Sequence, residues 1–371
     1  MRQAAPPTGA AGRRVLAWVL ALAALLMGTG ALALMLGVTP IPAEQVWAIL
    51  FEGGGERVPR LVIWTLRLPR FLLGALAGAA LAVVGVLLQD ALGNPLAEPG
   101  LLGVSSGASL TVAAIVILNL PVPFGLAPWF ALAGGLGAGL LVLLSTRLTR
   151  DPVRVVLIGA ALAALFSAAI TVIVVLGDPD EIQALYAFLV GSLTGRRWED
   201  LNVALPWLAV GIPLALLFAR PLNLLQLGDD MAEGLGLPVF RTRTLILLLS
   251  AAMVAAVVAV CGPIGFLALI VPHMVRRVLG TSDARQVLPL AALLGASLLT
   301  LADLLARELL RPAELPVGLL TIALGSPVAL ILLRRALGEK QRGSAVSDAG
   351  RGPHKPAGQA TMEPRRRMGR L

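Results

Sequence analysis

Three arginines stand at the ends of apolar segments, where a fixed positive charge can bind a carboxylate. Arg67 and Arg70 are three residues apart, so their side chains share a face if the segment is helical. Arg307 follows Asp303 by four residues, a spacing that favours an ion pair within one helix. A guanidinium holds a carboxylate through two parallel hydrogen bonds. From these residues alone we expect an internal Asp303–Arg307 pair, whereas Arg67 and Arg70 have no obvious local acid.

Other residue types limit the chemistry that this chain can perform by itself. Of its 371 residues one is cysteine, Cys261, and two are histidine, His273 and His354, which does not suit a metal site. The phosphate-binding pattern GxxxxGKS or GxxxxGKT is absent, and the apolar segments lack paired acids or a nucleophile–base set. We therefore expect no catalytic residue, metal or cofactor in this chain. If ATP drives it, a second polypeptide uses the ATP and Mg²⁺.

The segment GDDMAEGLGLP at 228–238 has the pattern of a short surface helix. Asp229 and Asp230 suit a helix N-terminus, where acidic side chains cap the chain and favour the dipole. Gly236 suits the turn that ends such a helix. One apolar face is expected, formed by Met231, Ala232 and Leu235. That face either docks on a partner or packs on the chain's own membrane segments, and these residues leave both possibilities open.

The composition indicates that lipid is the solvent of this chain. Hydrophobic residues make up 57% and charged residues 14%, against about 25% charged residues in soluble domains. A helix satisfies its own backbone hydrogen bonds in lipid, and each span needs about 20 apolar residues. We expect an all-α membrane protein, a polytopic bundle of about ten transmembrane helices, some of them broken. The expected spans are 15–37, 70–89, 99–118, 126–146, 154–176, 200–219, 243–261, 263–279, 286–305 and 315–333.

Prolines and basic residues predict the course of the chain. Pro95 and Pro99 precede the third span, and Pro263 and Pro272 interrupt the eighth, so these two are expected to be irregular. The excess of basic residues places the N-terminus in the cytoplasm. Eight of the 30 lysines and arginines then lie outside, which are Arg57, Arg60, Arg67, Arg70, Arg196, Arg197, Arg307 and Arg311.

The chain divides into three parts by composition. We expect a cytoplasmic segment at 1–14, a transmembrane domain at 15–335 and a disordered cytoplasmic tail at 336–371, which is rich in Arg, Gly, Pro and Ser. The net charge of +9 is dispersed among loops with few aromatic residues nearby. Nucleic acid is therefore not an expected partner, whereas membrane lipid is.

Longer motifs between Leu66 and Arg335 resemble the permease subunit of the FecCD family of ABC importers, which take up iron-siderophores, haem or cobalamin. These motifs are RLPR at 67–70, Gln89, NPLAEPGLLGVSSGA at 94–108, DDMAEGLG at 229–236, PHMVRR at 272–277, ADLLAR at 302–307 and ELPVGLLT at 314–321. The resemblance implies a homodimer with ten helices per subunit, two ATPase subunits and a solute-binding protein outside. It also implies that the fifth and tenth spans line the passage between the two subunits.

The same resemblance implies roles for individual residues. Docking of the binding protein falls to Arg67, Arg70 and Arg307. ATPase coupling falls to Gly228, Asp229, Asp230, Ala232, Leu235 and Gly236. Structural positions are Gln89, Asn94, Pro95, Pro272, His273, Arg276, Pro316 and Gly318, with His273 as part of a turn rather than a proton relay.

The function expected is that of a permease subunit of an ATP-driven importer in the bacterial inner membrane. Its expected cargo is an iron-siderophore complex delivered by a periplasmic or extracellular binding protein, with cobalamin or haem as the alternative. An ion-coupled carrier needs ionisable residues at mid-membrane, and Asp303, near an outer end, is the nearest candidate. An intramembrane enzyme would need paired acids or a nucleophile and a base, and the apolar segments of this chain lack such residues.

Overall fold

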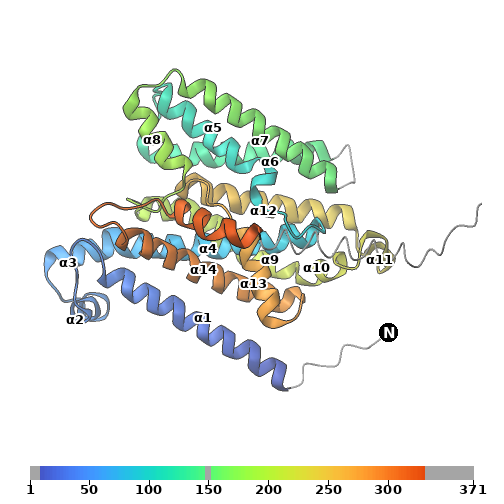
Figure 1. The fold of residues 1–371 in the computed structure, drawn as a ribbon, viewed down its shortest axis with the longest axis horizontal. Helices are drawn as coiled ribbons and strands as arrows, with labels where there is room; N and C mark the ends of the chain where they lie inside the picture. The colour runs from blue at the N-terminus through green and yellow to red at the C-terminus, as the bar shows by residue number, and fades with distance from the viewer. Residues whose placement is uncertain (1–8, 147–151, 331–371) are drawn as a thin grey trace, which may run out of the picture. The chain divides into compact units, whose positions relative to one another are not determined.

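The computed structural model describes residues 9–146 and 152–330, and the regular structure in these residues is helical (Figure 1). The expected tail at 336–371 and most of the expected segment at 1–14 lie outside the described residues. Seven helices of the described chain are long and apolar enough to cross a membrane. They are α1 (Gly9–Met35), α4 (Leu68–Ala91), α6 (Ala127–Thr146), α7 (Pro152–Val174), α9 (Trp198–Leu217), α12 (Val239–Cys261) and α14 (Ala284–Glu308).

Three shorter helices complete the ten segments expected from hydropathy. They are α5 (Val104–Ile117), α13 (Leu267–Leu279) and the helix Val317–Leu330. The 13 residues of α13 rise by roughly 20 Å, less than the ~30 Å hydrocarbon core. Residues 262–266 before α13 are not helical, and a short 3₁₀ turn, Pro99–Leu102, precedes α5. The expected irregularity before the third span and at Pro263 is thus confirmed, whereas the expected interruption at Pro272 is wrong, because α13 continues through that residue.

The remaining helices are short connectors. They are α2 (Ala43–Trp47), α3 (Arg57–Leu61), α8 (Pro179–Leu189), α10 (Ala219–Leu225) and α11 (Asp229–Gly234). Several helix ends follow local sequence rules. Gly262 ends α12 and Gly280 ends α13, each with a positive φ that suits glycine. The side chain of Asp283 caps α14 by accepting a hydrogen bond from the backbone N–H of Arg285.

Helix α4 is the buried centre of residues 9–329. It packs against α14, α12, α13 and α9 (Figure 1), and its side chains from Ala80 to Ala91 are all buried. Two glycines allow this packing, because a Cβ at Gly78 would lie 2.3 Å from the carbonyl oxygen of Gly295 and one at Gly85 would lie 1.9 Å from that of Ala268. Small residues let helix backbones approach closely in lipid. Motifs at either end of α4 are therefore held by a densely packed rod.

Candidate functional site

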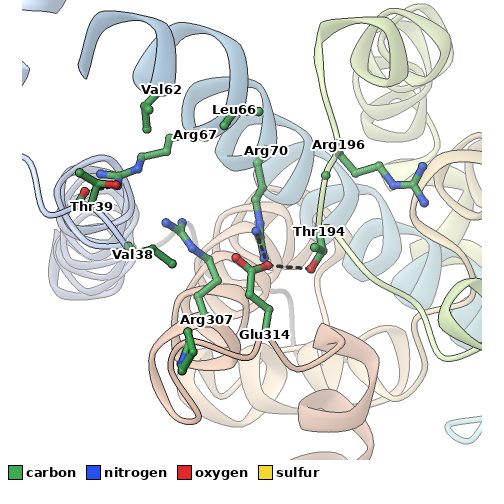
Figure 2. Close-up of a pocket in the computed structure, with 13 residues that line it drawn as sticks. Val38, Thr39, Val62, Leu66, Arg67, Arg70, Thr194, Arg196, Arg307 and Glu314 are labelled. Atoms are coloured by element: carbon green, nitrogen blue, oxygen red, sulfur yellow. Dashed lines mark hydrogen bonds and ion pairs between the residues drawn. The ribbon is translucent and has the colours of Figure 1, made fainter. Parts of the chain in front are cut away.

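A pocket of about 260 Å³ lies at the N-terminal end of α4 (Figure 2). We call it the outer pocket, because the orientation predicted from the basic residues places it outside. The three predicted docking arginines, Arg67, Arg70 and Arg307, all line it, together with Glu314 and Thr194. The structure thus brings together side chains from α4, from α14 and from the two loops around residues 194 and 314.

Arg70 is bound by two acidic residues that the local sequence did not reveal. Its Nε and Nη2 donate to the carboxylate of Asp303, each at 2.9 Å, and its Nη1 donates to Oε2 of Glu314 at 2.8 Å. The Thr194 hydroxyl also donates to Glu314, as Figure 2 shows. The expectation of an Asp303–Arg307 pair is therefore wrong, because Asp303 points across to α4. Arg70 joins α4, α14 and the loop after α14.

Arg67 and Arg307 instead hold the C-terminal end of α1. Arg67 donates to the carbonyl oxygens of Leu34, Met35 and Thr39, and Arg307 donates to those of Ala33 and Leu36. The last four carbonyls of a helix have no partner within it, and a positive charge there favours the helix dipole. In Figure 2 both guanidiniums point toward the chain at Val38 and Thr39. The two arginines therefore form a C-cap supplied by other helices.

The charges of these two arginines are not matched by a carboxylate in an ion pair within residues 9–146 and 152–330. Arg67 is 6% and Arg307 7% exposed. Gly37 makes room for both, because a Cβ there would lie 2.7 Å from Nη2 of Arg67 and 3.0 Å from Nη2 of Arg307. Its φ of +144° also suits glycine. Two buried positive charges thus share the outer pocket.

Glu314 is the acid of the outer pocket that lies outside the spans. Burial works to raise its pKa, but the charge and hydrogen bond of Arg70, with help from Thr194 and Arg307, outweigh burial. The pKa of Glu314 therefore lies below its ordinary value of 4.5. This carboxylate stays charged at neutral pH and keeps its bond to Arg70.

At the opposite end of α4 a second polar cluster forms, which we call the inner network. Arg276 on α13 donates to Oε1 of Gln89 at 2.7 Å and to Oδ1 of Asp90 at 2.9 Å. The Gln89 amide donates in turn to the backbone carbonyls of Ala268 and Leu269 at the start of α13. Four of the predicted structural positions meet here, since Arg276 and Gln89 are joined by His273 and Pro95, where His273 Nε2 lies 2.8 Å from the carbonyl oxygen of Pro95.

Arg243, on the first turn of α12, also belongs to the inner network. Its Nη1 and Nη2 donate to the carboxylate of Asp229 at 3.0 and 2.8 Å, and its Nε donates to the carbonyl oxygen of Ala91 at 2.7 Å. It connects the start of α11 to the last residue of α4. The inner network lines a groove of about 680 Å³ that also includes His273 and Gly228.

Helix α11 exposes only part of the apolar face expected from its sequence. Met231 is 59% and Leu235 57% exposed, whereas Ala232 is fully buried. Met231 and Leu235 are four residues apart and share a side, and Ala232 lies on the side that packs on the protein. The expected common face of all three residues is wrong for this reason. The turn after α11 agrees with expectation, because Gly236 has a φ of +87°.

The other predicted motif residues have structural surroundings. The Asn94 side chain accepts a hydrogen bond from the backbone N–H of Leu96, and Pro272 is buried within α13. Gly318 must be glycine, because a Cβ there would lie 1.7 Å from the carbonyl oxygen of Val190. The carbonyl oxygen of Pro316 accepts from the N–H of Leu319, which closes the turn into the last helix.

Three participants escaped the sequence analysis, namely Glu314 as an acid, Thr194 and Arg243. Each lies outside the apolar runs or at the edge of one, and its partner is distant in the chain. Arg70 and Glu314 are 244 residues apart. The one available signal was a charged residue, Arg243, close to the start of an apolar segment. Arginines are common at the ends of membrane spans, so this position alone does not predict a specific contact.

Comparison with known proteins agrees with these features. The model of the FecCD transport family matches residues 25–335. The chain is 42% identical over 323 residues to an Fe(3+) dicitrate transport system permease protein of Escherichia coli (strain K12), covering 86% of this chain and 99% of that relative. It is 44% identical over 283 residues to a hemin transport system permease protein of Yersinia pestis, covering 74% and 83% of the two chains.

A more distant relative and a solved structure point the same way. The chain is 38% identical over 314 residues to a cobalamin import system permease protein of Halobacterium salinarum, covering 84% of each. A solved metal-chelate type ABC transporter in an inward-facing conformation superposes with a TM-score of 0.75 at 29% identity, covering 85% of this chain and 98% of that one. Because the family model spans residues 25–335 and the relatives align over 83–99% of their own length, the chain belongs to the FecCD transport family.

Proposed function

We propose that this chain is the multi-pass inner-membrane permease subunit of an ATP-driven importer and that it carries an iron chelate. One observation carries the proposal, which is the 42% identity to a ferric dicitrate permease over 99% of that relative. The fold supports it, because the chain, with its seven long apolar helices, resembles the solved metal-chelate type transporter. Transport, rather than catalysis, is the role of such a subunit.

ATP hydrolysis is the task of a separate ATPase subunit in this proposal. The chain has no GxxxxGKS or GxxxxGKT motif to cradle phosphates. Helix α11 offers a docking element, because Met231 and Leu235 are exposed on one side of it while Ala232 anchors the other. By family resemblance two copies of this permease work with two ATPase subunits. An ATPase that binds both copies would move the two α11 helices together.

Binding-protein docking is the proposed use of the outer pocket. Arg67 and Arg307 supply positive charge without a carboxylate in an ion pair among the described residues, and an incoming acidic side chain of a binding protein would complement it. Arg70 is a weaker candidate, since Asp303 and Glu314 already occupy three of its donor positions. We therefore assign Arg70 mainly to holding the pocket together.

The cargo alternatives are haem and cobalamin, since relatives of both kinds align over most of the chain. An ion-coupled carrier is less well supported. Its best candidate for a coupling residue, Asp303, is held by Arg70 at a helix end rather than standing free at mid-membrane.

Uptake in a strain that lacks this gene tests the proposal directly. Labelled ferric dicitrate, a ferric hydroxamate, haem and cobalamin would be supplied separately, with and without the restored gene. We expect the restored gene to rescue uptake of an iron chelate, and uptake should stop when ATP is depleted. Rescue of cobalamin or haem alone would replace the cargo but keep the mechanism. Uptake that follows an ion gradient and survives ATP depletion would contradict the importer class.

A further inference from the structure

Arg243 makes contacts that the proposed functions of the two ends do not use. It is 9% exposed, and its three described hydrogen bonds reach two different elements. The fork of Nη1 and Nη2 holds Asp229 at the start of α11, and Nε holds the carbonyl oxygen of Ala91 at the end of α4. Ala91 and Arg243 are 152 residues apart, so α4 and α11 meet through this side chain rather than through a short connection.

The geometry of this link is stiff. A guanidinium is planar, so a carboxylate bound to one edge and a carbonyl bound through Nε keep a fixed relation to each other. Both bonds carry charge, which makes them shorter and stronger than bonds between neutral groups. The carbonyl of Ala91 is one of the last four of α4, which have no partner within the helix. Arg243 therefore fills a vacant bonding position that belongs to α4 itself.

The end of α4 receives this link where it is already clamped. Arg276 on α13 binds Gln89 and Asp90, which are two residues and one residue before Ala91. The last turn of α4 is thus held by α12 on one side and by α13 on the other. In contrast, α11 is a short helix with an exposed side. A displacement of α11 has a direct polar path into the most buried helix of the bundle.

We infer that Arg243 is a positioning residue that couples movement of α11 to the C-terminal end of α4. This inference rests on the proposed docking of α11 to an ATPase, and it adds the route by which that docking reaches the centre of the membrane domain. The fork to Asp229 receives the displacement, and the bond to Ala91 transmits it.

Hydrogen–deuterium exchange of the purified permease–ATPase complex tests the route without knowledge of the cargo. Exchange would be measured with and without ATP, at the amides of α11 and at those of residues 88–94. In the wild type we expect ATP to change exchange in both segments. In Asp229→Ala the response of α11 should remain while the response of residues 88–94 is lost. Arg243→Lys, which keeps the charge but not the fork, should lose it as well.

Two further variants separate transmission from simple stability. Arg241→Ala removes an exposed arginine from the same helical turn and should keep both responses. Arg243→Ala removes both bonds, and the double variant with Asp229→Ala should respond no less than Arg243→Ala alone, because the two residues act through one link. Asp229→Ala is the more informative single change, since its side chain is half exposed and folding tolerates its loss better.

Several outcomes would overturn the inference. One is a wild type in which ATP leaves residues 88–94 unchanged. Another is a normal response of these residues in Asp229→Ala, which would leave Arg243 as a cap of α4 and no more. Absence of any ATPase-dependent change in α11 itself is a different result, because it would contradict the proposed docking of α11 rather than the link behind it.

Discussion

At the scale of single residues, Arg67 and Arg307 combine a structural role with a proposed docking role in the outer pocket. Arg67 and Arg307 hold the carbonyls at the end of α1 and also carry the charge proposed for docking. We predict that Arg67→Glu with Arg307→Glu weakens capture of the binding protein by at least ~30-fold, since truncating one partner of a buried charge pair costs about 2–5 kcal/mol. Co-purification of the permease with its binding protein measures the effect.

The matched control for this prediction is Arg57→Glu with Arg60→Glu, which reverses two exposed arginines on α3. We expect that control to keep capture near the wild-type level. The glutamate variant will also lose some thermal stability, because the α1 carbonyls lose their donors. An acid-to-arginine change in the binding protein should restore capture without restoring that stability. Capture that stays normal in the double glutamate variant would remove docking from these residues.

Glu314 gives the outer pocket a dependence on pH. Its pKa lies below the ordinary value of 4.5 because Arg70 stabilises the charged form. A carboxyl whose pKa is lowered by folding contributes its full stabilisation when the pH is well above its unfolded-state pKa. This contribution is lost as the pH falls through the folded-state pKa. We predict that Glu314→Gln lowers the Tm at pH 7 and that the gap to wild type closes below about pH 4.5. Thermal unfolding in detergent across this range measures it; a gap independent of pH would contradict the assignment.

Sequence reasoning could place these residues on one side of the membrane but could not pair them. The lengths of the apolar segments place Arg67, Arg70 and Arg307 at helix ends on the same side of the membrane. The partner of Arg70 is Asp303, which is 233 residues away, and local spacing instead favoured the neighbour four residues on. Side-chain pairing across helices depends on the rotation of each helix about its axis relative to its neighbours, and hydropathy does not determine that rotation.

At the scale of helices, the close backbone packing around α4 holds both the outer pocket and the inner network in place. A Cβ at Gly78 would lie 2.3 Å from backbone of α14. We predict that Gly78→Ala destabilises the protein by about 1–3 kcal/mol through overpacking. Gly28→Ala in α1 is the matched control, because its Cβ would meet nothing within 4 Å, and alanine there should be neutral or slightly stabilising. Thermal unfolding of both variants compares them; equal melting temperatures would contradict the packing argument.

Helix α11 makes a separate prediction about the ATPase. Its exposed side carries Met231 and Leu235, so Leu235→Asp should place a charge in a docking interface without disturbing the core. We expect the ATPase to be lost on purification while the permease keeps its melting temperature. Ala232→Asp, by contrast, should unfold the region, since Ala232 is fully buried. Normal co-purification of Leu235→Asp would show that this side of α11 is not the docking surface.

The helices themselves were the most predictable part of the molecule, for a physical reason. In lipid the backbone must satisfy its own hydrogen bonds, which a helix does, so each of the ten expected segments overlaps a helix in the described residues. The residues at which individual helices begin were harder to predict. Helix α1 begins at Gly9, before the expected 15, and α13 begins only at Leu267. The irregular backbone at residues 262–266 is buried or half-buried in the protein, and hydropathy does not separate it from a helix.

At the scale of the whole molecule, the proposed pairing with a second copy would cover part of the large apolar surface, and lipid would cover the rest. Leu165 on α7 and Leu324 on the last helix are each 62% exposed, and Leu20 on α1 is 61% exposed. Exposure alone does not distinguish the three sites, because lipid covers apolar side chains as well as a protein does. The family resemblance implies that the fifth and tenth spans, which contain Leu165 and Leu324, line the passage between the two subunits.

Cysteine cross-linking separates these surfaces because the chain offers a clean background. Its single cysteine, Cys261, is fully buried, and a buried thiol in apolar surroundings reacts slowly. We predict that Leu165→Cys or Leu324→Cys gives a covalent dimer with a short bifunctional thiol reagent in membranes, whereas Leu20→Cys stays monomeric. Diluting labelled protein with excess unlabelled lipid vesicles before reaction distinguishes a stable pair from chance collision. A dimer formed only through Leu20→Cys would place the subunit interface on α1 and contradict the arrangement implied by the family.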